Sequence, residues 1–428
     1  MFFMKQIITD FTTWSRNIRL FFIANMLYQI GTGMFSVLYN LYIQGLGYTD
    51  AVNGQVVSIQ SLATALMFIP IGLLSDRSSR KKMLILGALF SGAALISRSL
   101  LEAKFGLLSL AVFTGLFASF FQVIAVPFLA ESVSKTDRLR MFSYHAAVSL
   151  AAQVIGSMGG GSLADLLQHA GMAHLLSLRT VLIIGGAATL ASFIPLLFVS
   201  EPPKKTETAP LEPEILDPTK AAHPGKLEAR ADFKVIAQFT VAQLLVGLGS
   251  GLVIPYLNLY FTNRFSVSLT SVGLLISLGQ IMTIVSMLIG PSLAARYGQV
   301  KAVLIFQMLS LPFLLVTGFT HLIVIASIGF LFRQALMNAA NPIQSAIMID
   351  RVPDRRRGIA NSMTQTAFML GWATMGPVQA HLVTTYGSYW GYAITFSVTG
   401  LLYVASSILY YWMFREPRSS STISGSSV

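Results

Sequence analysis

Long apolar segments alternate with short polar breaks along almost the whole chain. The apolar segments cover residues 20–44, 53–75, 82–101, 105–130, 141–168 and 177–199, and then 235–262, 270–293, 302–320, 322–349, 358–385 and 389–414. Each is about long enough to cross a bilayer as a helix, which takes roughly 20 apolar residues. The strict polar and apolar alternation of a membrane barrel strand is missing. We therefore predict an all-α integral membrane protein with 12 transmembrane helices.

A stretch rich in proline and charge divides these segments into two sets of six. Residues 200–232 carry six prolines among acids and lysines, a composition that cannot bury a core. We predict an N-terminal six-helix bundle over residues 1–199 and a cytoplasmic linker over 200–232. A C-terminal six-helix bundle over 233–418 and a disordered, Ser-rich tail over 419–428 complete the expected organisation.

Composition and charge agree with this picture. The chain is 54% hydrophobic and 11% charged, whereas a soluble domain has roughly 25% charged residues. All but five of the 29 Lys and Arg residues fall on one alternating set of loops, together with the ends and the linker. By the positive-inside rule that side is cytoplasmic, so the net charge of +12 reflects topology rather than a nucleic-acid partner. The five exceptions are Arg98, Lys104, Arg179, Arg264 and Arg333.

These observations exclude several classes of function. The chain has no cysteine, and its six histidines lack the spacing of metal ligands, so we expect no metal site and no cofactor. Clusters with catalytic spacing and phosphate-binding loops are also missing, which argues against an enzyme or an ATP-driven pump. A receptor that binds a solute without moving it is an alternative, but the linker and tail are short for a signalling domain.

The two sets of six helices share an internal repeat. Gly31, Gly33 and Asn40-Leu41-Tyr42 recur 218 residues later as Gly249, Gly251 and Asn258-Leu259-Tyr260, and Gly54, Ser58 and Arg77 recur 219 residues later as Gly273, Ser277 and Arg296. Two similar halves are one of the known plans of secondary transporters, which place the substrate near the midplane between the halves.

The connection after the second segment points to a family. Residues 72–82 read Gly-Leu-Leu-Ser-Asp-Arg-Ser-Ser-Arg-Lys-Lys, which resembles the loop signature of the major facilitator superfamily, with Ser79 in the place of a glycine. The counterpart around Arg296 has lost the Asp, as is usual in that family. The resemblance covers nearly the whole chain and implies a transporter working by alternating access in the plasma (inner) membrane. Both termini would be cytoplasmic, and a small-molecule substrate and membrane lipids would be its partners. We expect a monomer.

Charged residues at the cytoplasmic helix ends form a predicted conformational latch. Its members are Asp76, Arg77, Arg80, Glu131 and Arg138 in the first half, with Asp350, Arg355 and Arg356 as the counterpart in the second half. Ion pairs of this kind can hold two helix bundles in one state and release them in the other. The alternative is that these charges only fix the topology, because exposed ion pairs contribute little stability.

Arg333 is the most informative residue within a predicted helix, because a buried cation near the bilayer midplane is costly and marks a functional site by default. Polar or soft side chains share its helix face or a similar depth in other helices. The predicted substrate-binding residues are Arg333, Met337, Asn338 and Asn341, with Asn25, Gln29, Gln153, Gln280 and Trp372. The alternatives are a structural arginine and, for small polar residues such as Thr32 and Ser36, plain helix packing.

No Asp or Glu lies in the middle of a predicted helix, so we expect a neutral, amphiphilic or anionic substrate. If the substrate has an acidic group, we expect that group to pair with Arg333. Residues 156–161 read Gly-Ser-Met-Gly-Gly-Gly, which is similar to the antiporter signature of the family with Ser157 in the place of Pro. In the family this signature accompanies export, so the resemblance implies the drug and metabolite efflux branches. Close helix packing through Gly156, Gly160 and Gly161 is the alternative.

A coupling proton is expected, with Asp76, Glu131, Asp350 or His145 as its carrier. Proton-coupled uptake or facilitated diffusion of an organic anion remains the runner-up function.

Overall fold

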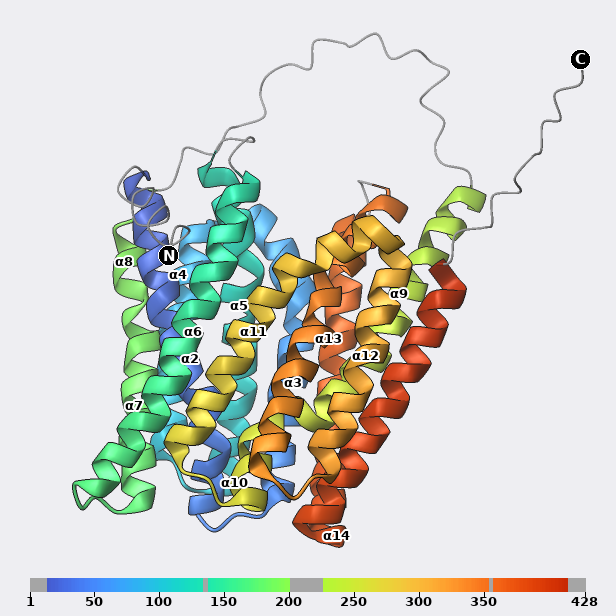
Figure 1. Cartoon of the computed structure of the whole chain (residues 1–428). Coiled ribbons are helices and arrows are strands. Elements are labelled where there is room, and N and C mark those ends of the chain that lie inside the picture. Colours follow the sequence, from blue (N-terminus) through green and yellow to red (C-terminus); the bar gives the residue numbers. More distant parts are fainter. Residues whose placement is uncertain (1–13, 134–137, 201–225, 354–356, 415–428) are drawn as a thin grey trace, which may run out of the picture.

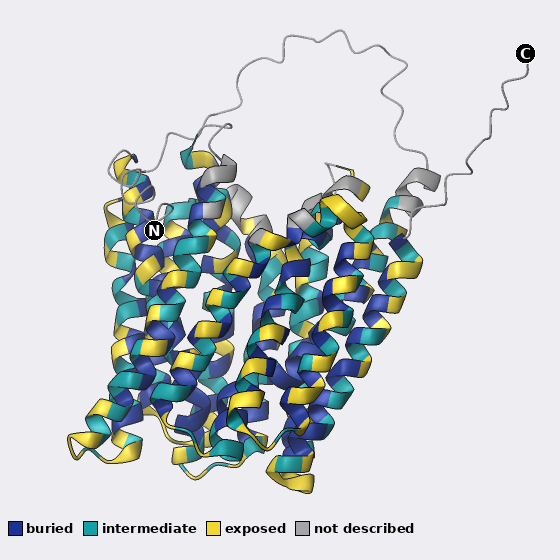
Figure 2. Cartoon of the chain, viewed as in Figure 1, coloured by how far each residue is buried: buried dark blue, intermediate teal, exposed yellow. Residues whose placement is uncertain are grey.

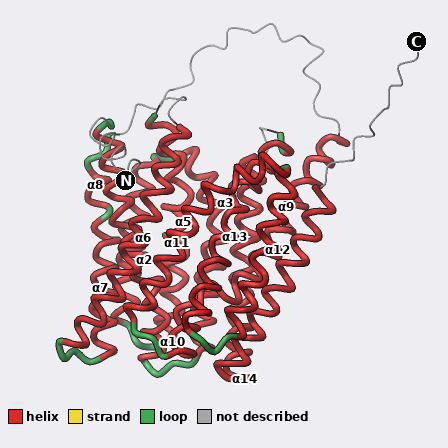
Figure 3. The backbone as a smooth tube through the Cα atoms, in the orientation of Figure 1, coloured by secondary structure: helices red, strands yellow, loops and turns green. Residues whose placement is uncertain are grey.

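The computed structural model describes residues 14–133, 138–200, 226–353 and 357–414. Regular structure in these residues is helical, without strands, as predicted (Figure 3). The first half comprises α2 (Arg16–Gly45), α3 (Asp50–Arg77), α4 (Arg80–Leu100), α5 (Lys104–Ser132), α6 (Arg138–His169), α7 (His174–Ala191) and α8 (Phe193–Leu197). The second half comprises α9 (Lys226–Val253), η1 (Ile254–Tyr256), α10 (Leu257–Phe265), α11 (Leu269–Tyr297), α12 (Gln299–Phe319), α13 (Ile323–Arg351) and α14 (Arg357–Phe414).

Within the described residues, 11 helical segments are long and apolar enough to cross a membrane, against the 12 predicted. The difference lies in α14, which runs over 58 residues but has non-helical backbone at Gly387. A Cβ atom added to Gly391 would lie 2.5 Å from the Cα atom of Val383, so the chain folds back at this point. The hairpin accounts for the eleventh and twelfth predicted helices.

The seventh predicted helix is interrupted. A 3-10 turn over Ile254–Tyr256 separates α9 from α10. Pro255 lies in this turn and has no backbone N–H to continue an α-helix. At its other end α9 begins at Lys226, inside the stretch predicted as linker, because the residues after Gly225 are good helix formers.

The two ends of the bundle differ (Figure 1). Ser200 and Lys226, which flank the proline-rich stretch, lie at one end, here named the linker face and drawn at the top of Figure 1. The helices α2, α4 and α9 begin at this face, and α6 also starts from it. The opposite end, named the far face, carries α10 and the α14 hairpin.

The halves contact each other mainly through two pairs of helices, α3 with α14 and α6 with α11, and α2 also contacts α10 and α11. A Cβ atom on Gly54 would lie 2.5 Å from the carbonyl oxygen of Gly376, and one on Gly273 would lie 2.5 Å from that of Ser157. Gly54 and Gly273 are equivalent in the sequence repeat, so the two contacts repeat as well. One core cluster includes Tyr42 and Tyr260 and so joins both halves, while three others lie within single halves. Figure 2 shows that buried residues occur in the helices of both halves.

Candidate functional site

Two cavities open inside the bundle. The larger cavity, of about 870 Å³, lies between the halves and is lined by residues of α2 to α6 and of η1, α10, α11, α13 and α14. The smaller cavity, of about 320 Å³, lies within the second half among α9, α13 and α14. Ile254 in the interrupted helix lines both cavities. Acidic residues are missing from the described lining of each.

Five of the predicted substrate-binding residues line the larger cavity: Asn25, Gln29, Gln153, Gln280 and Trp372. The structure thus brings together side chains from four helices that are distant in sequence. Asn25 donates from Nδ2 to Ser149 Oγ at 2.8 Å, and Trp372 donates from Nε1 to Ser250 Oγ at 2.8 Å. The carbonyl oxygen of the Gln280 side chain is buried and has no hydrogen-bond partner among the described residues. These side chains give the cavity donors and acceptors without charge.

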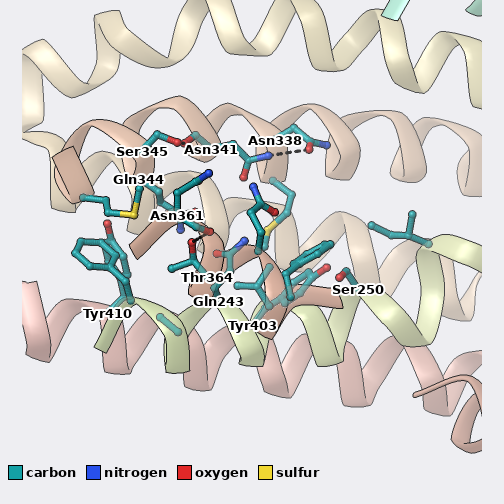
Figure 4. Close-up of a pocket in the computed structure, with 18 of the residues that line it drawn as sticks. Gln243, Ser250, Asn338, Asn341, Gln344, Ser345, Asn361, Thr364, Tyr403 and Tyr410 are labelled. Atoms are coloured by element: carbon teal, nitrogen blue, oxygen red, sulfur yellow. Dashed lines mark hydrogen bonds between the residues drawn. The ribbon is translucent and has the colours of Figure 1, made fainter. Parts of the chain in front are cut away.

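The other four, Arg333, Met337, Asn338 and Asn341, line the smaller cavity. Asn341 donates to Asn338 Oδ1 at 3.1 Å, and Asn338 donates to the backbone carbonyl of Gln334 at 2.8 Å. Figure 4 shows that these amides face hydroxyl and amide side chains on the other two helices. This second group was not predicted from the sequence and includes Gln243, Ser250, Asn361, Thr364, Gln365, Tyr403 and Tyr410.

Arg333 is buried, with 1% of its surface exposed. It donates a hydrogen bond from Nη2 to Gln334 Oε1, interacts with Tyr403, and leaves Nε without a partner among the described residues. Its guanidinium carbon lies 5.9 Å from the centroid of the Phe330 ring. The side chain therefore has neutral neighbours and no described carboxylate to balance its charge.

A second buried arginine was not singled out from the sequence. Arg98 is 2% exposed and lines the larger cavity. In the sequence it is one of the five basic residues outside the cytoplasmic loops, and it was not among the predicted substrate-binding residues. Because Cα–Cβ bonds tilt toward the start of a helix, a long side chain near the end of α4 turns back toward the membrane interior. Helix direction was the signal that could have identified it.

Thr32 and Ser36, for which helix packing was the alternative, combine two features. Each donates to a backbone carbonyl of its own helix, Thr32 to Gln29 at 3.1 Å and Ser36 to Gly33 at 2.7 Å. Both also line the larger cavity. Their hydroxyl protons are used locally, but their oxygens still border the space between the halves.

The Gly-rich run of the fifth predicted helix packs closely against its neighbours. A Cβ atom on Gly156 would lie 2.1 Å from the carbonyl oxygen of Ile30, and one on Gly161 would lie 2.3 Å from that of Leu269. On Gly160 it would approach Met34 to 3.2 Å. The run thus places α6 against α2 in its own half and against α11 in the other, which is the packing role considered from the sequence.

Part of the predicted latch is described. Arg80 Nη1 lies 2.9 Å from Glu131 Oε1 and donates to the carbonyl of Pro127 at 2.7 Å. This ion pair joins α4 to α5 within the first half and does not bridge the halves. The side chains of Asp76, Arg77, Arg138, Asp350, Arg355 and Arg356 lie outside the described residues.

His145, one of the expected proton carriers, lies in the wall of the larger cavity. It lines the larger cavity, and its ring centroid is 5.7 Å from that of Phe21. The ring Nε2 atom is buried without a hydrogen-bond partner among the described residues. His145 therefore belongs to the cavity wall rather than to the membrane surface.

Described hydrogen bonds between the halves lie away from the linker face. Asp165 Oδ2 accepts from the backbone N–H of Thr270 at 2.7 Å, at the far ends of α6 and α11. Ser277 donates to the carbonyl of Val154 at 3.1 Å, deeper in the same helix pair. Asn40 and Asn258 join α2 to α10 and also line the cavity. The halves are thus held together on the far side of the larger cavity.

Comparisons with known proteins agree with this architecture. The family model described as Major Facilitator Superfamily matches residues 21–237 and 239–427. An uncharacterised MFS-type transporter of Methanocaldococcus jannaschii is 23% identical over 359 residues, which covers 83% of this chain and 88% of the relative.

Two solved structures show the same fold. A D-xylose–proton symporter has a TM-score of 0.74 at 13% identity, covering 94% of this chain and 97% of its own. A bacterial homologue of the human lysosomal transporter Spinster, in an inward-facing and unoccupied conformation, has a TM-score of 0.72 at 15% identity, covering 92% and 96%. The chain therefore belongs to the major facilitator superfamily and is a multi-pass membrane transporter, not an enzyme.

Proposed function

We propose that this transporter moves a small amphiphilic or anionic organic solute by alternating access. The observation that carries the proposal is the charge of the cavities: each has one buried arginine and no acidic residue in its described lining. A hydrophobic cation would meet uncompensated positive charge, whereas an anion would be attracted and could accept charge-assisted hydrogen bonds. Aromatic residues such as Tyr28, Phe121 and Trp372 in the larger cavity suit an apolar body.

We further propose export from the cell in exchange for protons. The support is the resemblance of residues 156–161 to the antiporter signature, although their close packing also serves the fold. Of the two described candidates for the coupling proton, Glu131 pairs with Arg80 away from the cavities. His145 is the better candidate, because it lines the larger cavity and lacks a partner at Nε2 among the described residues. Proton-coupled uptake or facilitated diffusion of an organic anion is the second candidate function.

The positive-inside distribution of Lys and Arg supports a plasma (inner) membrane protein with cytoplasmic termini and linker. In that orientation the linker face is cytoplasmic, and the contacts at the far face hold a conformation with its outer side closed.

Flux through proteoliposomes of known orientation, with an imposed pH gradient, tests both parts. We expect efflux of amphiphilic carboxylates from the linker side to be faster when the far side is acidic, and hydrophobic cations to be poor substrates. Equal transport of cations and anions would contradict the substrate class, and accumulation toward the linker side would favour uptake. ATP should have no effect on the rates.

A further inference from the structure

Arg98 is positioned to present its charge to the larger cavity. The helix α4 runs from Arg80 at the linker face to Leu100 at the far face, and Arg98 lies two residues before its end. Its side chain turns back to meet Gln60 of α3 and Tyr39 of α2, and all three residues line the cavity.

The guanidinium has only neutral described partners. Arg98 Nη1 donates to Gln60 Oε1 at 2.7 Å, and the guanidinium carbon lies 4.0 Å from the centroid of the Tyr39 ring. The Nε–H is buried and has no partner among the described residues. Arginine keeps its proton in proteins, so the charge cannot be removed by deprotonation.

The nearest acid in sequence is already engaged. Glu102, four residues after Arg98 and beyond the end of α4, forms an ion pair with Arg179 at the far face, and its side chain is 58% exposed. A buried cation without an anionic partner is expensive, and packing alone would be satisfied by a neutral side chain of similar size. The charge is thus better explained by an anion that enters the cavity than by the fold.

The remaining lining indicates the chemical class of that anion. Elsewhere in its lining the same cavity carries the stacked rings of Tyr28 and Phe121, whose centroids are 4.2 Å apart, together with amide side chains such as Gln122. Aromatic and amide groups suit an apolar body with a few polar atoms, whereas a strongly hydrated inorganic ion would need more charged ligands.

We propose that Arg98 is the anion-binding residue of the larger cavity and pairs with the acidic group of an amphiphilic organic solute. The buried Nε–H and the second terminal nitrogen are the donors of Arg98 that no described residue accepts, and a carboxylate would pair with them. This inference rests on the proposed function and deepens it, because it assigns the acidic end of the solute to a residue of the first half, separate from Arg333. Bound in this way, the solute has its acidic end near Tyr39 and its body against the aromatic side chains.

Equilibrium binding to the purified full chain tests the proposal. The probes are 2-naphthoate, indole-3-acetate and decanoate, each compared with its neutral carboxamide at pH 7. We expect the wild type to bind the carboxylates about 10- to 100-fold more tightly than the amides, as a charge-assisted hydrogen bond provides. Arg98→Gln should reduce this carboxylate-over-amide preference by about 10- to 100-fold, because it removes the charge-assisted hydrogen bond. Binding of the amides should stay unchanged.

Two further variants distinguish an effect on anion binding from an effect on folding. Arg98→Lys keeps the charge and should retain part of the preference, since lysine offers a point charge without the planar fork. Arg264→Gln is the matched control: Arg264 also stacks on a tyrosine, 4.3 Å from the centroid of Tyr389, and donates to the carbonyl of Gly318 at 2.6 Å, but it lines neither cavity. It should leave the ratio unchanged.

The outcomes distinguish this inference from the proposed function. If the wild type binds carboxylates and amides alike, both fail. If the wild type prefers carboxylates and folded Arg98→Gln keeps that preference, only the role of Arg98 fails. Equal loss of carboxylate and amide affinity in Arg98→Gln and Arg98→Lys would indicate a structural arginine and would also overturn the assignment.

Discussion

Asn40 and Asn258 exchange hydrogen bonds across the interface between the halves. Asn40 Nδ2 donates to the carbonyl of Pro255 at 2.7 Å, and Asn258 Nδ2 donates to the carbonyl of Val37 at 2.8 Å. The two asparagines are 218 residues apart, and so are the two acceptors. The sequence repeat therefore corresponds to a reciprocal contact about a pseudo-twofold axis, and both side chains are buried on the far side of the larger cavity.

Replacing either asparagine should destabilise the closed far face. Asn40→Ala and Asn258→Ala each remove a buried donor and leave a carbonyl unpaired, at a cost of about 1–3 kcal/mol. Because the bonds hold the halves together, this cost shifts the equilibrium toward opening at the far face, by roughly tenfold for about 1.4 kcal/mol. The native chain has no cysteine, so Gln280→Cys in the cavity can report the shift through its reactivity with an impermeant thiol reagent added from the far side.

Asn25→Ala is the control for this experiment. Asn25 is also a buried asparagine, but its hydrogen bond to Ser149 lies within the first half. It should leave the reactivity of the reporter cysteine unchanged. If Asn40→Ala and Asn258→Ala also leave the reactivity of the reporter cysteine unchanged, the asparagine pair does not control opening of the far face.

A disulfide across the far ends of α6 and α11 should stop the transport cycle. Asp165 and Thr270 are in hydrogen-bond contact in this conformation, and alternating access requires such contacts to break. We expect Asp165→Cys combined with Thr270→Cys to form a cross-link under mild oxidation, to abolish flux, and to recover it on reduction. Each single cysteine variant serves as control, and full flux in the cross-linked protein would show that this contact persists throughout the cycle.

The helical plan was predictable because a membrane-spanning helix requires a long apolar run, and such runs are visible in one sequence. The interruption at Ile254–Tyr256 was not predicted, because Pro255 lies inside an apolar run and proline is tolerated in membrane helices when neighbours satisfy the freed groups. Here Asn40 satisfies the carbonyl of Pro255 itself. That partner comes from the other half of the chain and could not be read from local sequence.

The candidate site was predictable to the extent that helix position determines depth. Arg333 lies well inside its helix, and its burial follows from that position. The depth of Arg98 depends on helix direction and on the length of its side chain, so its position near a helix end did not reveal its burial. The division of the predicted residues between two cavities depends on how α13 rotates against its neighbours, since Arg333 lines one cavity and Gln334 the other.

The ion pair of Arg80 with Glu131 should contribute little to stability. Its side chains are 19% and 54% exposed, so solvent and salt screen the attraction. We expect Glu131→Gln to lower the free energy of unfolding by less than about 1 kcal/mol. Chemical denaturation followed by circular dichroism at low and high salt measures this. A loss of several kcal/mol would instead indicate that Glu131 has partners beyond Arg80.

Replacing Arg333 should reduce anion transport without destabilising the fold. Arg333→Met removes the charge but keeps a long, flexible side chain, and apolar replacement of a buried charge is often neutral for stability. We therefore expect a melting temperature close to that of the wild type, together with anion flux reduced by about tenfold or more, since one charge-assisted hydrogen bond is worth about 1.5–3 kcal/mol. Flux of a neutral carboxamide should change little, because it loses no ionic partner. Arg333→Lys retains the charge and should keep part of the anion flux. If folded Arg333→Met transports anions at the wild-type rate, Arg333 is a structural residue and the smaller cavity lies outside the transport path.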